Sequence, residues 1–196
     1  MNNEAILLNI SRHIQLNEEE VSCFTSLVSQ RDVSRKSTVL REGELCKHLS
    51  FVHSGALRAF HVDREGKEST IMFALSDWWV TDMFCFLHAK PAMMYIEAIE
   101  DSSVIQLSRE NFDKLFQQIP KFERFFRILM QNAYTREQLR VIENLSLPAE
   151  ERYERFLQKY PHIAKAVTQK QIASYLGITP EFLSVIRKKR SRKSIS

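Results

Sequence analysis

The feature of this sequence that most limits its fold is a change of hydrophobic period near residue 32. Before that point, apolar residues such as Ile6, Ile10 and Phe24 recur at helical spacing. Beyond it, apolar and polar residues alternate in six short segments separated by turn signals such as Ser54-Gly55: residues 37–40, 49–53, 56–62, 68–73, 95–98 and 104–107. Many short strands at even spacing predict an antiparallel barrel, roll or sandwich.

The helical period returns after these segments. Ser108 is a suitable N-cap for one helix, and Pro120 opens a second that extends to about Leu145. About 25 residues at ~1.5 Å each span nearly 40 Å, which is more than the cover of a small barrel requires. One side of this long helix is apolar: Phe122, Phe125, Phe126, Leu129 and Ala133. Two alternatives stay open for that side, namely pairing with a second copy of the chain or packing on its own strands.

A further helical pattern, near the end of the sequence, is centred on Gly177. Thr168 with Gln171 has the spacing of a capping box at the start of one short helix. Gly177 can end that helix in the left-handed conformation, and Thr179 with Pro180 can cap and begin the next. The pattern predicts two short helices joined by a tight turn.

The apolar residues around this turn have the spacing of a helix-turn-helix. Ala173 lies four residues before the glycine, and Leu183 and Ile186 lie six and nine residues after it. In this motif the second helix enters the major groove of DNA. We therefore expect the following residues to contact DNA: Thr168, Gln169, Thr179, Pro180, Glu181, Ser184, Val185, Arg187, Lys188, Lys189 and Arg190.

Charge is distributed unevenly along the chain. The formal net charge is only +4, but residues 162–196 contain eight basic residues against Glu181, a local charge of +7 that leaves −3 for residues 1–161. The basic run 187–193 is expected to contact DNA phosphates.

Composition narrows the class of protein. A chain of 196 residues with 44% hydrophobic and 27% charged residues is expected to be globular. The three cysteines, Cys23, Cys46 and Cys85, match no disulfide framework or zinc motif, and no catalytic motif is found. We therefore expect that the chain is not an enzyme and that it binds no metal ion. The absence of a signal peptide and of a long apolar run predicts a cytoplasmic protein without membrane partners.

Taken with these motifs, the chain resembles the Crp/Fnr superfamily of bacterial transcription regulators over nearly its whole length. The stretches REGELCKHLSFVHSGALRAFHVDREGKES, EAIEDSSVIQLSRENF and IASYLGITPEFLS carry the resemblance. It implies an α+β fold with an N-terminal antiparallel double-stranded β-roll, similar to a jelly roll, a central dimerisation helix and a helix-turn-helix domain. The implied domains are a cyclic nucleotide-binding-like effector domain at 1–118, the dimerisation helix at 119–146, and the DNA-binding domain at 147–196.

The sequence departs from the family where cyclic nucleotides bind. Members that bind cyclic AMP have Gly-Glu and, about ten residues later, Arg-Ser or Arg-Thr, and the arginine holds the cyclic phosphate. Here Val80 and Thr81 align with the first pair, and Ala92 and Met93 with the second. Without the guanidinium a bound phosphate would lose its strongest charge-assisted contact. We therefore expect no response to cyclic AMP or cyclic GMP.

Six residues of this segment are candidates for an effector pocket: Trp78, Trp79, Thr81, Met83, Met93 and Tyr95. One interpretation is a pocket for an apolar or aromatic effector, and the other is a collapsed core that needs no ligand. No cofactor is expected, because three scattered cysteines cannot reproduce the four-cysteine iron–sulfur site of the oxygen-sensing members.

The second helix of the helix-turn-helix, and the sequence that follows it, also differ from the family. Val185 stands where members often have a guanine-reading arginine, whereas Glu181 matches the position that accepts a hydrogen bond from cytosine. The sequence ends at Ser196, before the usual wing hairpin, so some backbone contact is expected to pass to residues 187–193.

The predicted function is a homodimeric transcription regulator that binds a near-palindromic DNA site through residues 179–190, with RNA polymerase as a further candidate partner. The alternative is a ligand sensor that acts through protein–protein contacts and not through sequence-specific DNA binding.

Overall fold

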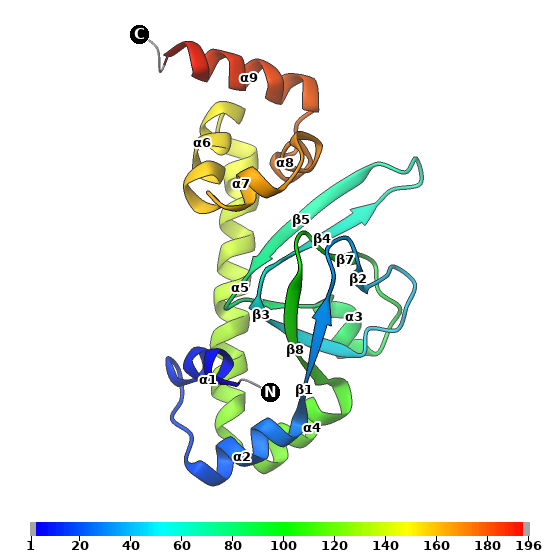
Figure 1. Cartoon of the computed structure of the whole chain (residues 1–196), viewed down its shortest axis with the longest axis vertical. Coiled ribbons are helices and arrows are strands. Elements are labelled where there is room, and N and C mark those ends of the chain that lie inside the picture. The colour runs from blue at the N-terminus through cyan, green and yellow to red at the C-terminus, as the bar shows by residue number, and fades with distance from the viewer. Residues whose placement is uncertain (1–2, 194–196) are drawn as a thin grey trace.

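The computed structural model describes residues 3–193, with the side chains of residues 3–191. In chain order its elements are α1 (Glu4–Ser11), α2 (Glu18–Leu27), β1 (Val28–Val33), β2 (Thr38–Leu40), β3 (His48–Ser54), β4 (Ala56–Val62), β5 (Glu68–Leu75), β6 (Trp79–Val80), α3 (Met83–His88), β7 (Tyr95–Ala98), β8 (Ser102–Ser108), α4 (Arg109–Gln118), α5 (Lys121–Ser146), α6 (Ala149–Lys159), α7 (Ile163–Ala166), α8 (Gln169–Leu176) and α9 (Pro180–Lys193). The long α5 runs beside the strands and connects the N-terminal helices to α6–α9 at the other end of the molecule (Figure 1). In the part of the chain described, no helix has both the length and the hydropathy of a membrane span.

The strands form two four-stranded antiparallel sheets, in the orders β1-β8-β3-β6 and β2-β7-β4-β5. The predicted α+β fold with an antiparallel roll is confirmed, and all six predicted strands are present. Sequence analysis missed β1 and β6. In β1 only Val28 and Val33 are buried, so the strand shows no apolar alternation and is held instead by its pairing with β8. The other missed strand, β6, contains two residues and pairs with β3.

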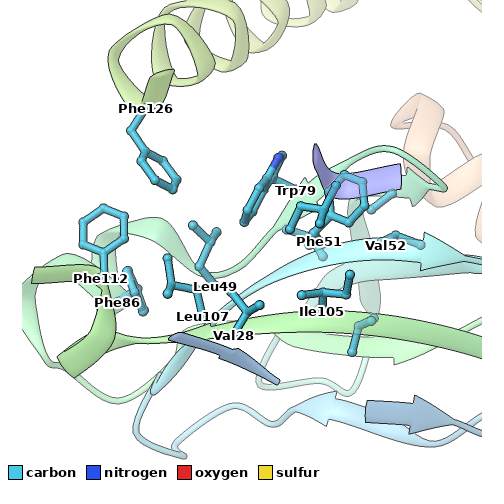
Figure 2. Close-up of a cluster of buried hydrophobic side chains, with 14 of the residues drawn as sticks. Val28, Leu49, Phe51, Val52, Trp79, Phe86, Ile105, Leu107, Phe112 and Phe126 are labelled. Carbon is cyan, nitrogen blue, oxygen red and sulfur yellow. The ribbon is translucent and has the colours of Figure 1, made fainter. Parts of the chain in front are cut away.

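The larger core lies between the sheets and extends to α5. Phe126 of α5 points toward Phe112 and Trp79, above strand residues such as Leu49 and Leu107 (Figure 2). Phe122 and Phe125 are also fully buried in this core.

This burial corrects part of the prediction about α5. Phe122, Phe125 and Phe126 have no surface left for a second copy of the chain, because they pack on the chain's own strands and helices. Leu129 packs partly against the same core, and Ala133 is half-buried. For these three phenylalanines, the alternative that holds is packing within the chain and not pairing with a second copy.

A second core joins the C-terminal helices to the outer face of the β4–β5 sheet. Phe73 of β5 contacts Phe156, Tyr160 and Tyr175, with ring centroids 5.3–6.0 Å apart. Buried residues of α8 and α9 complete this cluster. The position of the C-terminal helices is thus fixed by packing on the roll as well as by the connection to α5.

Candidate nucleic-acid interface

The turn between α8 and α9 is built as the sequence predicts. The backbone N–H of Gln171 donates to Thr168 Oγ1 at 3.2 Å, and the Thr168 N–H donates to Gln171 Oε1 at 2.9 Å, which completes the capping box. Gly177 has φ +67°, a conformation that favours glycine. The Ile178 N–H donates to Ala173 O at 3.0 Å and closes the helix end.

The two helices cross at the small residue that the sequence indicated. Ala173, Leu183 and Ile186 are all buried, and they share a core with Tyr153 and Phe156 of α6. Because these side chains lock the angle between α8 and α9, the unit has the geometry of a helix-turn-helix.

The opposite side of α9 is open to solvent. Glu181, Val185 and Lys188 are exposed and recur at helical spacing, so they share one face, with Ser184 half-buried beside them. Thr179 and Pro180 lie at the start of the helix, where Thr179 Oγ1 accepts the Phe182 N–H at 3.2 Å. In Figure 1 this helix forms the outer end of the molecule, so the described chain leaves room for a large partner there.

The basic run 187–193 is part of α9. Helical geometry turns two of its cations toward α6: Lys189 Nζ lies 3.4 Å from Glu150 and Arg190 Nε lies 2.8 Å from Glu154. Arg187 and Lys188 are exposed, and neither forms an ion pair within the described residues. The side chains of residues 192 and 193, and residues 194–196, lie outside the described part, so the expected transfer of wing contacts stays a prediction.

Sequence analysis missed a polar contact that holds the helix-turn-helix on the roll. Ser174 Oγ of α8 accepts the Thr70 N–H at 2.6 Å and donates to Glu68 O at 2.9 Å, both on β5. Thr70 Oγ1 in turn accepts from Nε of the buried Arg58 at 3.0 Å. A serine on the polar side of a short helix gives no sequence signal for such a contact.

The second half of α5 exposes an apolar stripe that sequence analysis also missed. Tyr134, Val141 and Leu145 are 70%, 54% and 84% exposed, and Ile142 is exposed next to them. Spacings of seven and four residues place the first three on one side of the helix, in the pattern of a coiled-coil seam. This spacing is visible in the sequence and could have predicted the exposed stripe. The prediction for this helix rested instead on the phenylalanines near its start.

The segment aligned with the cyclic-nucleotide cassette is held by its own carboxylate. Asp82 is fully buried and accepts the backbone N–H groups of Cys85 at 3.2 Å and Met93 at 2.8 Å. The Thr81 hydroxyl donates to His48 O at 2.9 Å. Val80 is buried in β6 and Ala92 is buried in the loop, so neither offers a polar group to a ligand.

The six effector-pocket candidates lie in different surroundings, and a pocket shared by all six stays a prediction. Trp79 lies in the larger core and donates from Nε1 to Asn9, whereas Trp78 packs partly against both cores and lies beside Tyr160, which directly follows α6. Met93 is exposed, and Tyr95 stacks on Phe60. Thr81 is held by the backbone of His48, and Met83 packs partly against the larger core. For Trp79, the core interpretation applies.

The roll nevertheless contains a cavity of about 340 Å³, and none of these six side chains lines it. Its lining is mixed, with Leu40, Val80 and Ile96 beside His48 and Gln106. Burial lowers the pKa of His48, and the nearby Arg31 and Lys47 lower it further, which favours a neutral imidazole.

Comparisons with known proteins agree with this architecture. Residues 30–119 match the cyclic nucleotide-binding domain family. Electron transport regulator A of Shewanella oneidensis is 22% identical over 183 residues, covering 86% of this chain and 72% of that protein. The fumarate and nitrate reduction regulatory protein of Vibrio cholerae is 24% identical over 181 residues, covering 86% and 72%.

Solved structures share the fold. A protein of Eubacterium rectale ascribed to the Crp/Fnr family of transcriptional regulators superposes with a TM-score of 0.74 at 17% identity, covering 91% of this chain and 85% of that one. The similarity includes both the roll and the C-terminal helices, because it extends over most of the chain.

Proposed function

We propose that this chain, which matches the cyclic nucleotide-binding domain family over residues 30–119 and is similar to the fumarate and nitrate reduction regulators, is a homodimeric, DNA-binding transcription regulator of the Crp/Fnr type. In this proposal residues 1–118 form the effector domain, 119–146 the dimerisation helix and 147–196 the DNA-binding domain. It acts in the cytoplasm, catalyses no reaction, and has RNA polymerase as a further partner.

The observation that carries the proposal is the outer face of α9. Glu181 and Val185 are exposed on a helix whose buried side is locked to α8, and Lys188 follows them on the same face. A carboxylate can accept a hydrogen bond from cytosine N4, and a valine can contact a thymine methyl group. Arg187 and Lys188, which no carboxylate neutralises in the described chain, are placed to contact phosphates on either side of the groove.

The dimer in this proposal uses the exposed stripe of Tyr134, Val141 and Leu145. Pairing of two α5 helices along this stripe would bury side chains that are now in solvent. The two α9 helices would then read half-sites about 34 Å apart in a near-palindromic site.

Cyclic AMP is not the effector in this proposal. The buried Asp82 carboxylate already accepts the N–H groups of Cys85 and Met93, and a phosphate placed near this anion would be repelled. Among the described residues that line the roll cavity there is no arginine.

The test is the salt dependence of DNA binding. Replacing Arg187 and Lys188 with alanine removes two phosphate contacts per subunit, or four per dimer. Each contact contributes about 0.9 to the slope of log K against log salt, so the slope should fall by about 3 to 4. Fluorescence anisotropy with a bound genomic fragment, measured over a range of salt concentrations, gives this slope.

The matched control replaces Lys189 and Arg190, which removes the same charge from the same helix but takes cations already paired with Glu150 and Glu154. For this control, the slope of log K against log salt should change by less than half as much as it does for the Arg187 and Lys188 double variant. Equal slopes for the two double variants would contradict the assigned face. Wild-type protein that binds no genomic fragment at low salt would overturn the proposal and favour a sensor that acts through protein contacts.

A further inference from the structure

A cleft of about 410 Å³ lies between the second half of α5, α6 and α8. This volume is in the range of small-molecule sites. Five cationic side chains line it, namely Arg136, Arg140, Arg152, Arg155 and Lys159, and the only carboxylate in the lining is Glu143. The rest of its wall combines the apolar and aromatic Leu139, Phe156, Tyr160, Tyr175 and Leu176 with the polar Asn132, Thr135 and Asn144.

The cations of this cleft are only partly neutralised. Arg136 and Arg140 share Glu137, at 3.4 and 3.0 Å. Arg155 bridges Glu143 at 2.7 Å and Glu151 at 2.8 Å. Five cations therefore face three carboxylates, which leaves two positive charges in excess.

Arg152 and Lys159 account for that excess. Arg152 donates to the neutral Asn144 at 2.8 Å, and its Nε is buried without a hydrogen-bond partner. Lys159 forms no ion pair within the described residues, and burial together with the nearby Arg136 lowers the pKa of its amine. Uncompensated positive charge in a partly buried site favours an anionic ligand.

The aromatic wall adds a second element of recognition. Tyr175 lies 5.6 Å from the guanidinium of Arg140, and Tyr160 lies 5.2 Å from the amine of Lys159. Burial raises the pKa of both phenols. A ligand that has both a flat ring and a doubly charged group would use both parts of the cleft.

The cleft is separate from the surfaces already described. A residue two positions along an α-helix is rotated by about 200°, so Arg136 and Glu143 face away from Tyr134 and Val141. Pairing of α5 along the apolar stripe would thus leave the cleft open. It also lies apart from the roll cavity, with which it shares no lining residue.

From these observations we infer that the cleft binds a small organic diphosphate-type anion, whose charged group contacts Arg152 and Lys159 and whose ring lies against the half-buried Tyr175. Because its walls come from α5 on one side and from α6 and α8 on the other, a bound anion fastens the helix-turn-helix unit to the long helix.

Isothermal titration of the full-length, DNA-free protein tests this inference, with ADP, pyrophosphate and adenosine as probes. We expect ADP to bind most tightly, pyrophosphate at least tenfold more weakly, and adenosine more weakly still. ADP at 100 times its Kd should raise the melting temperature by about 5 °C or more. The titration needs neither DNA nor a dimer, so its result is independent of whether the chain binds DNA.

Two variants locate the site. Replacing Arg152 and Lys159 with glutamine should weaken ADP binding at least tenfold, whereas the same changes at the exposed Arg41 and Lys90 should leave it unchanged. L139W fills the cleft without removing a charge and should also abolish binding, which keeps the inference testable if the charge variant fails to fold. Absence of ADP and pyrophosphate binding would overturn it. Loss of binding in K47Q, at the roll cavity, with no loss in the cleft variants would do the same.

Discussion

Replacing Val141 and Leu145 with glutamate should leave the chain monomeric and lower its affinity for its DNA site at least 100-fold. These side chains are exposed on the same side of α5 as Tyr134, so the change is expected to leave the folded chain intact. In the dimer, four glutamates would meet along one seam and repel each other. A monomer must bind each half-site separately, and it loses the effective concentration that linkage of two binding units provides, a factor of 10² to 10⁴.

Sedimentation equilibrium and gel shift on the same preparation measure both parts of this prediction. The matched control is L8E, which places the same charge on an exposed leucine of α1 and should change neither property. A V141E/L145E double variant that stays dimeric would show that the interface lies elsewhere. A monomer with wild-type affinity would show that dimerisation does not support DNA binding.

Replacing Arg58 with methionine should lower the free energy of unfolding by about 2 to 4 kcal/mol. The side chain is 1% exposed, and its Nη atoms lie 2.8 Å from Glu68 and 3.3 Å from Glu97. It also lies 4.2 Å from the Phe60 ring. Methionine keeps much of the packing but leaves two carboxylates without their cation. Both carboxylates are partly exposed, so water can solvate them after the substitution. The expected loss of unfolding free energy is therefore below the upper end for fully buried ion pairs.

The same substitution should loosen the helix-turn-helix unit from the roll. Arg58 Nε donates to Thr70 Oγ1, which lies 3.0 Å from Ser174 Oγ. Amide hydrogen exchange should therefore be faster in α8 as well as in β4. The control is R41M, which removes an exposed ion pair with Glu44 at 4.0 Å and should change stability by no more than about 0.5 kcal/mol. Urea unfolding measures both variants, and a loss below about 1 kcal/mol for R58M would contradict this role for Arg58.

Much of the fold could be predicted because its elements follow local rules. Strand β4 begins directly after the turn signal Ser54-Gly55, and its predicted bounds, 56–62, are those of the structure. The helix-turn-helix is equally local, because the Thr168–Gln171 capping box and Gly177 act within a few residues of each other. Strand β1 was missed because its stability comes from pairing with β8, whose partner residues lie 69 to 79 positions away in the sequence.

The candidate sites were harder to predict, because periodicity shows that a face is buried but not which partner buries it. Phe122, Phe125 and Phe126 have the pattern of an interface, yet they pack on the roll. Trp79 is buried in the larger core, whereas its neighbour Trp78 packs partly against both cores, which composition cannot reveal. Lys189 and Arg190 looked like phosphate contacts, but their pairing with α6 depends on how α9 lies across that helix.

The proposed reading of DNA by a dimer can be tested by selecting genomic DNA fragments with the purified wild-type protein and sequencing them. We expect fragments that share an inverted repeat, with half-site centres one helical turn, about 10 base pairs, apart. Fragments that share no motif, or that contain only a single half-site without its inverted copy, would contradict a dimer that reads DNA through two α9 helices.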